Sequence, residues 1–310
     1  MMVHSGSVII KGEPYIIERN YPFRIGFLND IHAGSQFGMF PTRWVSKSKG
    51  TTTFPNIGQR RLNKYLDDYA SHCREVETNL LFCPGDLTAG YNIIERGKYI
   101  VDTDIDEQKA IAANIIASFY KKVPSIEKIY LWSGTGYHGS VDTSDERGIA
   151  DILKKDYGVP VEYKEEYSFV ELFYGDEKKR LLIMHAAPDA YIYPEQAMGK
   201  DMMLYQEGVA KKKLVPVDMI IRAHKHSYIE VHKPTIRSIQ LPCFQFFTPY
   251  DSALKSFARF QPDIGSIIML FDDKLRTTIW HFIYNNFINP ERYLKIIADK
   301  EVVSKRLSKK

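Results

Sequence analysis

The stretch RIGFLNDIH, residues 24–32, joins a short apolar run to an aspartate and a histidine. Arg24–Leu28 has no alternation of polar and apolar residues, which is typical of a strand buried on both faces. Asn29 and Asp30 then supply turn residues, and His32 follows two positions later. We therefore expect a buried strand whose end carries a carboxylate and an imidazole.

Four more apolar runs of similar length end in polar or glycine-containing turns. They are Asn79–Cys83, Lys128–Trp132, Arg180–Met184 and Val217–Ile221. Apolar residues at helical spacing lie between the runs and predict helices over Gln59–Glu75, Asp106–Lys122, Glu146–Tyr157 and Met202–Lys213. Strands that alternate with helices indicate an α/β fold with a mostly parallel sheet covered by helices.

The rest of the chain predicts antiparallel strands and a tail. Glu162–Phe173 and Arg180–Met184 flank a hairpin turn at residues 174–177. Three runs after His226 read as strands of a second sheet that closes a sandwich: Thr235–Phe247, Gly265–Phe271 and Leu275–Tyr284. Pro290–Ile297 reads as a last helix before a basic tail. We expect one domain over residues 1–285, followed by a terminal helix and tail over 286–310.

Composition excludes several classes of protein. The 310 residues are 44% apolar and include 17 Phe, 20 Tyr and 3 Trp, so the chain has enough core material to exclude a disordered protein. No apolar run reaches the roughly 18 residues that span a bilayer, and the first residues do not read as a signal peptide. Three cysteines are too few for a disulfide framework, which favours the cytoplasm. The net charge of +4 is too small to indicate nucleic acid by itself.

The polar residues at the five strand ends make one chemical set. In order they are Asp30-Ile31-His32, Gly85-Asp86, residues 134–138 (GTGYH), His185 and His224-Lys225-His226. The carboxyl ends of parallel strands lie at one edge of a sheet, so we expect these side chains to meet. Carboxylates and imidazoles without thiolates suit Mn, Fe, Ni or Zn. Two such ions, bridged by a carboxylate and a water, polarise a phosphoryl oxygen and supply hydroxide near neutral pH.

This order of motifs resembles that of the calcineurin-like metallophosphoesterases, whose blocks read D-x-H, G-D, G-N-H, H and G-H-x-H. The resemblance runs from about Arg24 to His226. It implies a four-layer α/β/β/α sandwich of two mixed sheets flanked by helices, and a phosphoesterase with two divalent metal ions, manganese first and iron, zinc or nickel as alternatives. It also implies the roles of the site residues. Asp30, His32 and His226 would hold one ion, His185 and His224 the other, and Asp86 would bridge both.

The third block departs from the family pattern. Gly134-Thr135-Gly136-Tyr137-His138 stands where Gly-Asn-His is usual, loosely similar to blocks of phage-type or mobile-element members. In one alignment Thr135 replaces the asparagine ligand, and in the other Tyr137 does. We prefer Thr135, because Gly134-Thr135 directly follows the strand. His138 would then face the phosphate as the catalytic acid or as a stabiliser of the transition state, with metal ligand as the alternative role.

The substrate is less constrained than the chemistry. The loop Gly34–Gly58 and the helix after it carry Arg43, Lys47, Lys49, Arg60 and Arg61. Arg43 and Arg60, together with Tyr137, are our candidates for substrate binding, which slightly favours a phosphodiester or a nucleic acid. The alternatives are a phosphomonoesterase acting on protein or nucleotides, and an interaction module that keeps the fold without catalysis.

Overall fold

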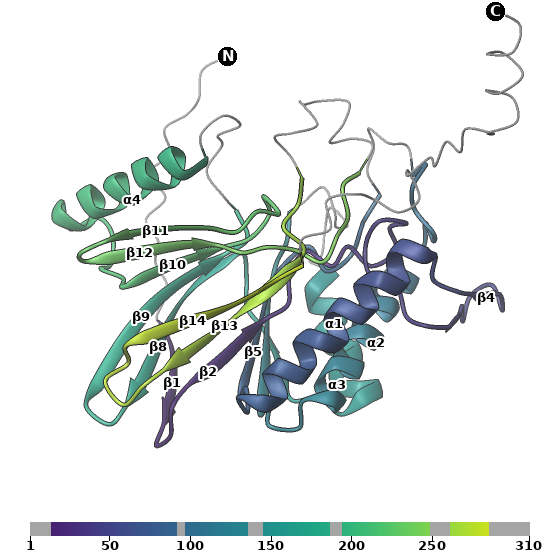
Figure 1. Cartoon of the computed structure of the whole chain (residues 1–310), viewed down its shortest axis with the longest axis horizontal. Helices are drawn as coiled ribbons and strands as arrows, with labels where there is room; N and C mark the ends of the chain where they lie inside the picture. The colour runs from purple at the N-terminus through teal and green to yellow at the C-terminus, as the bar shows by residue number, and fades with distance from the viewer. Residues whose placement is uncertain (1–13, 92–96, 136–144, 187–193, 249–260, 285–310) are drawn as a thin grey trace, which may run out of the picture.

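The computed structural model describes residues 14–91, 97–135, 145–186, 194–248 and 261–284 (Figure 1). The strands within these ranges are β1 (Tyr15–Arg19), β2 (Arg24–Phe27), β3 (Trp44–Val45), β4 (Thr52–Thr53), β5 (Leu80–Pro84), β6 (Lys128–Trp132), β7 (Val161–Tyr163), β8 (Tyr167–Tyr174), β9 (Glu177–Met184), β10 (Met219–Arg222), β11 (Ile229–Lys233), β12 (Ile236–Gln240), β13 (Gly265–Phe271) and β14 (Thr277–Ile283). The helices are α1 (Ile57–Glu75), α2 (Ile105–Lys122), α3 (Asp145–Tyr157) and α4 (Pro194–Ala210). The predicted helix Pro290–Ile297 and the basic tail lie outside the described residues.

Two mixed sheets form the centre of the molecule. The β9 sheet has the order β1-β8-β9-β10-β12-β11, and the β5 sheet has the order β14-β13-β2-β5-β6-β7. Strands β2, β5, β6 and β7 are parallel, whereas β13 and β14 add an antiparallel edge to the β5 sheet. In the β9 sheet, β8 and β9 form the predicted hairpin, and Gly175 in its turn has a φ of 58°.

Three apolar cores separate the four layers. Leu80 and Phe82 of β5 face the β9 sheet, whereas Leu81 and Cys83 face the helices α1, α2 and α3. On the far side of the β9 sheet, Ile220 packs against α4. Figure 1 shows α4 on one side of the paired sheets and the other three helices on the opposite side. The predicted four-layer α/β/β/α sandwich is therefore confirmed, and the alternation of faces in β5 explains why its sequence is apolar throughout.

The partners of the last strands were wrongly predicted. Thr235–Phe247, Gly265–Phe271 and Leu275–Tyr284 do not form a second sheet together. β12 lies parallel to β10 in the β9 sheet, while β13 and β14 extend the β5 sheet beyond β2. Glu162–Phe173 is likewise not one strand, because β7 belongs to the β5 sheet and β8 to the β9 sheet. An apolar run reports burial but carries no information on which strand lies beside it.

The segment Gly34–Gly58 is packed against the body of the protein at two points. Asn56 and Gln59 form a reciprocal capping box at the start of α1, and the side-chain amide of Gln59 donates to the Ser35 carbonyl (2.9 Å). Further along, β3 and β4 form a small antiparallel pair. The buried Glu107 carboxylate accepts from Trp44 Nε1 and Ser46 Oγ, both at 2.9 Å. The start of α1 is thus fixed beside the segment that follows His32.

In the described part of the chain, no helix combines the length and apolarity that crossing a membrane requires.

Candidate metal centre

Six of the predicted ligands gather in two clusters where the two sheets meet. The Asp30 cluster consists of Asp30, His32 and His226, and the Asp86 cluster of Asp86, His185 and His224. In each cluster the possible ligand atoms all lie within 4.8 Å of one another. The prediction that one sheet edge collects these residues needs correction. Strands β2 and β5 belong to one sheet and β9 and β10 to the other, so the clusters form where the strand ends of two sheets abut.

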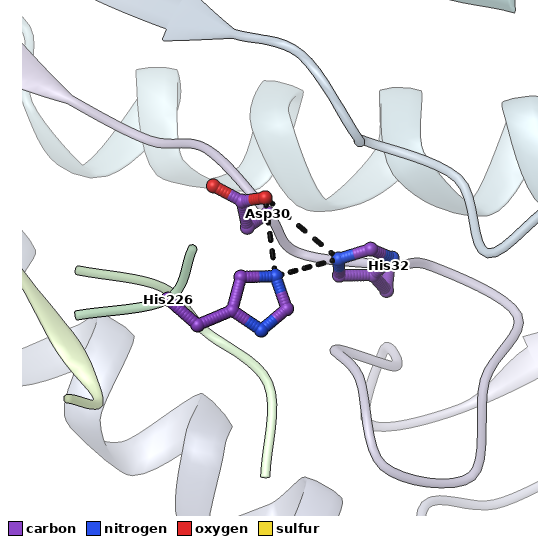
Figure 2. Close-up of side chains that lie close together, drawn as sticks. All are labelled: Asp30, His32 and His226. Atoms are coloured by element: carbon purple, nitrogen blue, oxygen red, sulfur yellow. Dashed lines mark hydrogen bonds and ion pairs between the residues drawn. The ribbon is translucent and has the colours of Figure 1, made fainter. Parts of the chain in front are cut away.

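The Asp30 cluster combines one chain segment with a distant histidine (Figure 2). His226 Nε2 lies 3.2 Å from Asp30 Oδ1 and 3.2 Å from His32 Nε2. The distance from His32 Nε2 to Asp30 Oδ1 is 3.8 Å. Asp30 and His32 are buried, whereas the His226 side chain is 23% exposed. Three potential ligand atoms therefore point at one small volume that is open on the His226 side.

The Asp86 cluster takes each residue from a different strand end. Asp86 Oδ2 lies 2.9 Å from His185 Nε2 and 3.9 Å from His224 Nδ1. Two contacts link this cluster to Asp30. His185 Nε2 lies 3.9 Å from Asp30 Oδ1, and the His224 amide donates to Asp30 Oδ2 at 3.3 Å. The two clusters are thus close enough to act on one group.

Hydrogen bonds around the clusters orient the ligand side chains so that one possible ligand atom of each points into its cluster. Asn29 Nδ2 donates to Asp30 Oδ2 (2.6 Å), while Asp30 Oδ1 faces the imidazoles. The Thr135 amide donates to Asp86 Oδ1 (2.7 Å), while Asp86 Oδ2 faces His185. His185 Nδ1 donates to the Pro84 carbonyl at 2.7 Å, so in the neutral ring Nε2 carries the lone pair. A ring nitrogen fixed in this way is typical of metal-binding histidines, and the donor set fits divalent transition metals.

The backbone at both clusters adopts a conformation that non-glycine residues rarely take. Positive φ angles occur at Asp30 (48°), His32 (42°), Asp86 (49°), His224 (83°) and His226 (57°). Each left-handed residue costs about 1–2 kcal/mol, so its retention needs a compensating role. Such outliers concentrate at functional sites, which supports a site at these strand ends.

Two glycines allow the strand ends to approach closely. A Cβ on Gly134 would lie 2.2 Å from Asp86 Oδ1 and 2.3 Å from the Asp86 nitrogen. A Cβ on Gly85, whose φ is 80°, would lie 2.6 Å from Gly134 Cα and 2.7 Å from His185 Nδ1. The Gly-Asp and Gly-Thr pairs of the sequence are therefore explained by contact between β5 and β6 without side chains.

Electrostatics couple the carboxylates to the imidazoles. Burial alone would raise the pKa of Asp30, but the His226 and His185 imidazoles outweigh it and hold this pKa at about 2. Burial lowers the pKa of His185, and the Asp86 and Asp30 carboxylates raise it more strongly, to about 9. In the metal-free protein, the raised pKa values of His185 and His226 favour protonated imidazoles beside the carboxylates.

The third block is described only in part. The Thr135 hydroxyl lies 3.1 Å from Asp86 Oδ1 and 3.3 Å from Asp86 Oδ2, so Thr135 contacts the carboxylate with both its amide and its side chain. Tyr137 and His138 lie outside the described residues. Their predicted roles in substrate binding and catalysis therefore stay predictions.

The predicted substrate-binding cations lie on the surface, Arg43 directly before β3 and Arg60 in the first turn of α1. Arg43 is exposed, and Arg60, also exposed, donates to the Pro55 carbonyl at 2.6 Å. Lys47 and Lys49 instead face acidic partners, Asp156 at 3.7 Å and Asp102 at 2.6 Å. Within the described ranges neither Arg43 nor Arg61 makes an ion pair, so these two cations are available to an anionic ligand.

Sequence reasoning missed three side chains that support the clusters. Asn29 holds Asp30, and Glu146 accepts from the Leu87 amide (3.3 Å) next to Asp86. Arg222 donates to the Ala186 carbonyl (2.7 Å) beside His185 and pairs with Asp201 of α4 (2.5 Å). A charged residue at the end of an apolar strand was a visible signal for Arg222. No local signal distinguishes Glu146 from an ordinary acid at a helix start.

Comparison with known proteins finds only remote likeness. No family model and no curated protein sequence matches the chain. Similar solved structures include an archaeal phosphodiesterase with 9% identity and a TM-score of 0.39, covering 84% of this chain and 100% of that one. A dimetal phosphatase from Danio rerio has 10% identity and a TM-score of 0.36, covering 83% and 93%. Vps29 from Entamoeba histolytica complexed with Zn²⁺ has 11% identity and a TM-score of 0.36, covering 84% and 99%.

These structures are described as phosphoesterases or as a Vps29 protein, but likeness at such TM-scores carries no functional argument. What the chain itself presents is a four-layer α/β/β/α protein with a candidate centre for two metal ions at the junction of its sheets.

Proposed function

We propose that the protein is a phosphoesterase that uses two divalent metal ions. The observation that carries this proposal is the pair of carboxylate–imidazole clusters, which are joined by the 3.9 Å approach of Asp30 Oδ1 to His185 Nε2. A pair of metal ions held this close suits a phosphate ester, whose oxygens accept positive charge from two sides. The motif order from Asp30 to His226, similar to that of the calcineurin-like metallophosphoesterases, supports the same reaction.

Each residue has a defined task in this proposal. Asp30, His32 and His226 would hold one ion, and Asp86, His185 and His224 the other, with Asp86 shared between them. When bound, such ions polarise a phosphoryl oxygen and lower the pKa of a bound water. Asn29, Thr135 and the Pro84 carbonyl keep the ligands oriented through the hydrogen bonds described above. His138 would donate a proton to the leaving oxygen or stabilise the transition state.

A phosphodiester, including nucleic acid, is our preferred substrate. The exposed Arg43 and Arg61 support it, because exposed cations attract a phosphate backbone. A phosphomonoester of a protein or nucleotide is the alternative. An interaction module without catalysis is the other alternative, since the third block departs from the family pattern. Manganese as the native ion and the cytoplasm as the location remain proposals from the sequence.

The decisive experiment compares two small substrates. Metal-free protein is supplied with Mn²⁺, and hydrolysis of bis-p-nitrophenyl phosphate and p-nitrophenyl phosphate is followed, with Asp30→Asn as the matched control variant. We expect Mn²⁺-dependent hydrolysis, faster for the diester, that the control loses. Two bound ions without hydrolysis of either substrate would refute the phosphoesterase and leave the interaction module.

A second arm addresses nucleic acid. Binding of a fluorescent single-stranded oligonucleotide is measured over a range of salt concentrations. Contacts to phosphates make the logarithm of the binding constant fall with the logarithm of salt, by about 0.7 per contact on single strands. Binding that does not depend on salt would contradict a nucleic-acid substrate and favour a small molecule.

A further inference from the structure

Two buried acids begin helix α3 and face the segment that carries Asp86. Asp145 and Glu146 are 1% and 4% exposed, although they occupy the first turn of the helix, where acids usually meet solvent. Asp145 Oδ2 accepts from the Thr88 hydroxyl at 2.9 Å, and Glu146 Oε1 accepts from the Leu87 amide at 3.3 Å. The start of α3 therefore holds the residues directly after Asp86.

Glu146 also reaches the strand end on the other side of Asp86. Burial and then the nearby Asp86 carboxylate raise the pKa of Glu146, and the backbone amides of Glu146, Leu87 and Gly134 oppose this rise. Leu87 directly follows Asp86. Gly134 directly precedes Thr135, whose amide donates to Asp86 Oδ1 at 2.7 Å. One buried side chain thus connects the two backbone segments that determine where the Asp86 carboxylate points.

The backbone amides at this contact need oxygen acceptors. An ionised glutamate accepts hydrogen bonds at both oxygens and donates none, whereas a glutamine replaces one oxygen with an NH₂ group. An NH₂ group set against backbone amides would leave donors facing donors in a buried place, at a cost of about 1–3 kcal/mol. A role limited to stabilising the helix start would not need contacts with two other strand ends.

We propose that Glu146 is a positioning residue that fixes Asp86 in the orientation in which it can hold metal. This inference rests on the proposed metal centre. It assigns to α3 a task in the site, although no residue of α3 belongs to either cluster.

The chain offers a matched control in Glu107. Glu107 is also a buried glutamate in the first turn of a helix, and it also accepts several hydrogen bonds from a neighbouring loop. Its partners are Trp44, Ser46 and Ser48, however, none of which flanks a member of either cluster. Glu107→Gln therefore imposes the same chemical change without touching the support of Asp86.

The test measures Mn²⁺ binding to metal-free wild type, Glu146→Gln and Glu107→Gln by calorimetry, together with the thermal unfolding of each metal-free protein. We expect both variants to unfold at lower temperature. Only Glu146→Gln should weaken an Mn²⁺ site, by about 10–100-fold, as is usual when the support of a ligand is lost. If Glu146→Gln does not fold, Glu146→Asp replaces it, because it keeps the charge but shortens the reach and should give a smaller loss in the same direction.

Two results would overturn the inference: wild-type Mn²⁺ affinity in Glu146→Gln, or an equal loss in Glu107→Gln. Wild-type protein that binds no Mn²⁺ would refute the metal centre and the role of Glu146 together. Wild-type protein that binds two ions but hydrolyses no phosphate ester would refute only the proposed reaction, and the comparison of the two variants would still decide the role of Glu146.

Discussion

The Asp30 cluster and the Asp86 cluster use the same ligand types but assemble them differently. Asp30 and His32 come from one short segment after β2, so only His226 has to be brought in from elsewhere. Asp86, His185 and His224 come from the ends of β5, β9 and β10, which belong to two sheets. The first cluster depends mainly on local backbone geometry, whereas the second depends on how the two sheets pack together.

The residues that hold the two aspartates show the same contrast between local and distant parts of the chain. Asp30 is held by its chain neighbour Asn29, whose amide also reaches the Pro242 carbonyl at 2.8 Å. Asp86 is held by Thr135 from the end of β6, over a contact that only glycine permits at position 134. We therefore expect the Asp86 cluster to be the more sensitive of the two to changes in packing.

The largest effect should come from Asp86→Asn. If Asp86 serves both ions, this change lowers the Mn²⁺ content from two ions to less than one, and activity by more than about 100-fold, because loss of a supporting contact alone costs 10–100-fold. Metal analysis after dialysis measures the content. A protein that keeps one full ion would show that Asp86 belongs only to its own cluster, and that the two clusters fill independently.

A smaller and more selective effect should follow from Gly134→Ala. The new Cβ would stand 2.2 Å from Asp86 Oδ1, so the carboxylate or the strand end must move. We expect about 1–3 kcal/mol of destabilisation, as is common for overpacking, and weaker Mn²⁺ binding at one site only. Gly199→Ala in α4 is the control, because nothing lies within 4 Å of its added Cβ. Urea unfolding measures the stability of Gly134→Ala, and calorimetry measures its Mn²⁺ affinity. An equal loss of affinity at both metal sites would remove the proposed difference between the clusters.

The smallest effect, taken per pH unit, concerns pH. The pKa of His185 lies at about 9 in the metal-free protein, above its ordinary value of about 6.5. The raised pKa stabilises the metal-free fold fully below pH 6.5, and this contribution is lost as the pH rises through 9. Metal binding must displace the proton, so Mn²⁺ affinity should rise over the same interval by a few-fold to about tenfold per pH unit. Calorimetry in buffers of different ionisation enthalpy measures the released proton, and an affinity that falls with pH would contradict a protonated His185.

The sequence was a good guide to strands and to the chemistry of their ends. The five apolar runs are all strands within one or two residues, apart from the earlier start of β9, because burial on both faces leaves a clear apolar signature. The strands β1 and β11 were missed. Both lie at an edge of the β9 sheet, where exposed residues such as Ile16 and His232 blur the pattern. The sequence did not show which sheet each strand joins, since the pairing of strands depends on the packing of the whole fold.

The candidate site shows the same division. Histidines and aspartates after buried strands could be found by position, because strand ends must face a common region. Glu146 could not be assigned from the sequence, and for Arg222 the sequence showed only a charge at a strand end without its partner, since their contacts join segments 59 and 36 residues apart in the chain. Residues that contact a ligand leave a local pattern, whereas residues that hold those residues in place leave almost none.

The left-handed residues of the two clusters have a consequence for heat tolerance. Five residues within one small region adopt the left-handed backbone conformation, and each lowers the stability of the fold by about 1–2 kcal/mol relative to ordinary helix or strand geometry. Within the described strands, only Gly265 has a positive φ, so the strand ends can lose their order while the sandwich stays folded. On warming, the metal-free protein should therefore lose its capacity to take up metal at a temperature below the one at which its core melts.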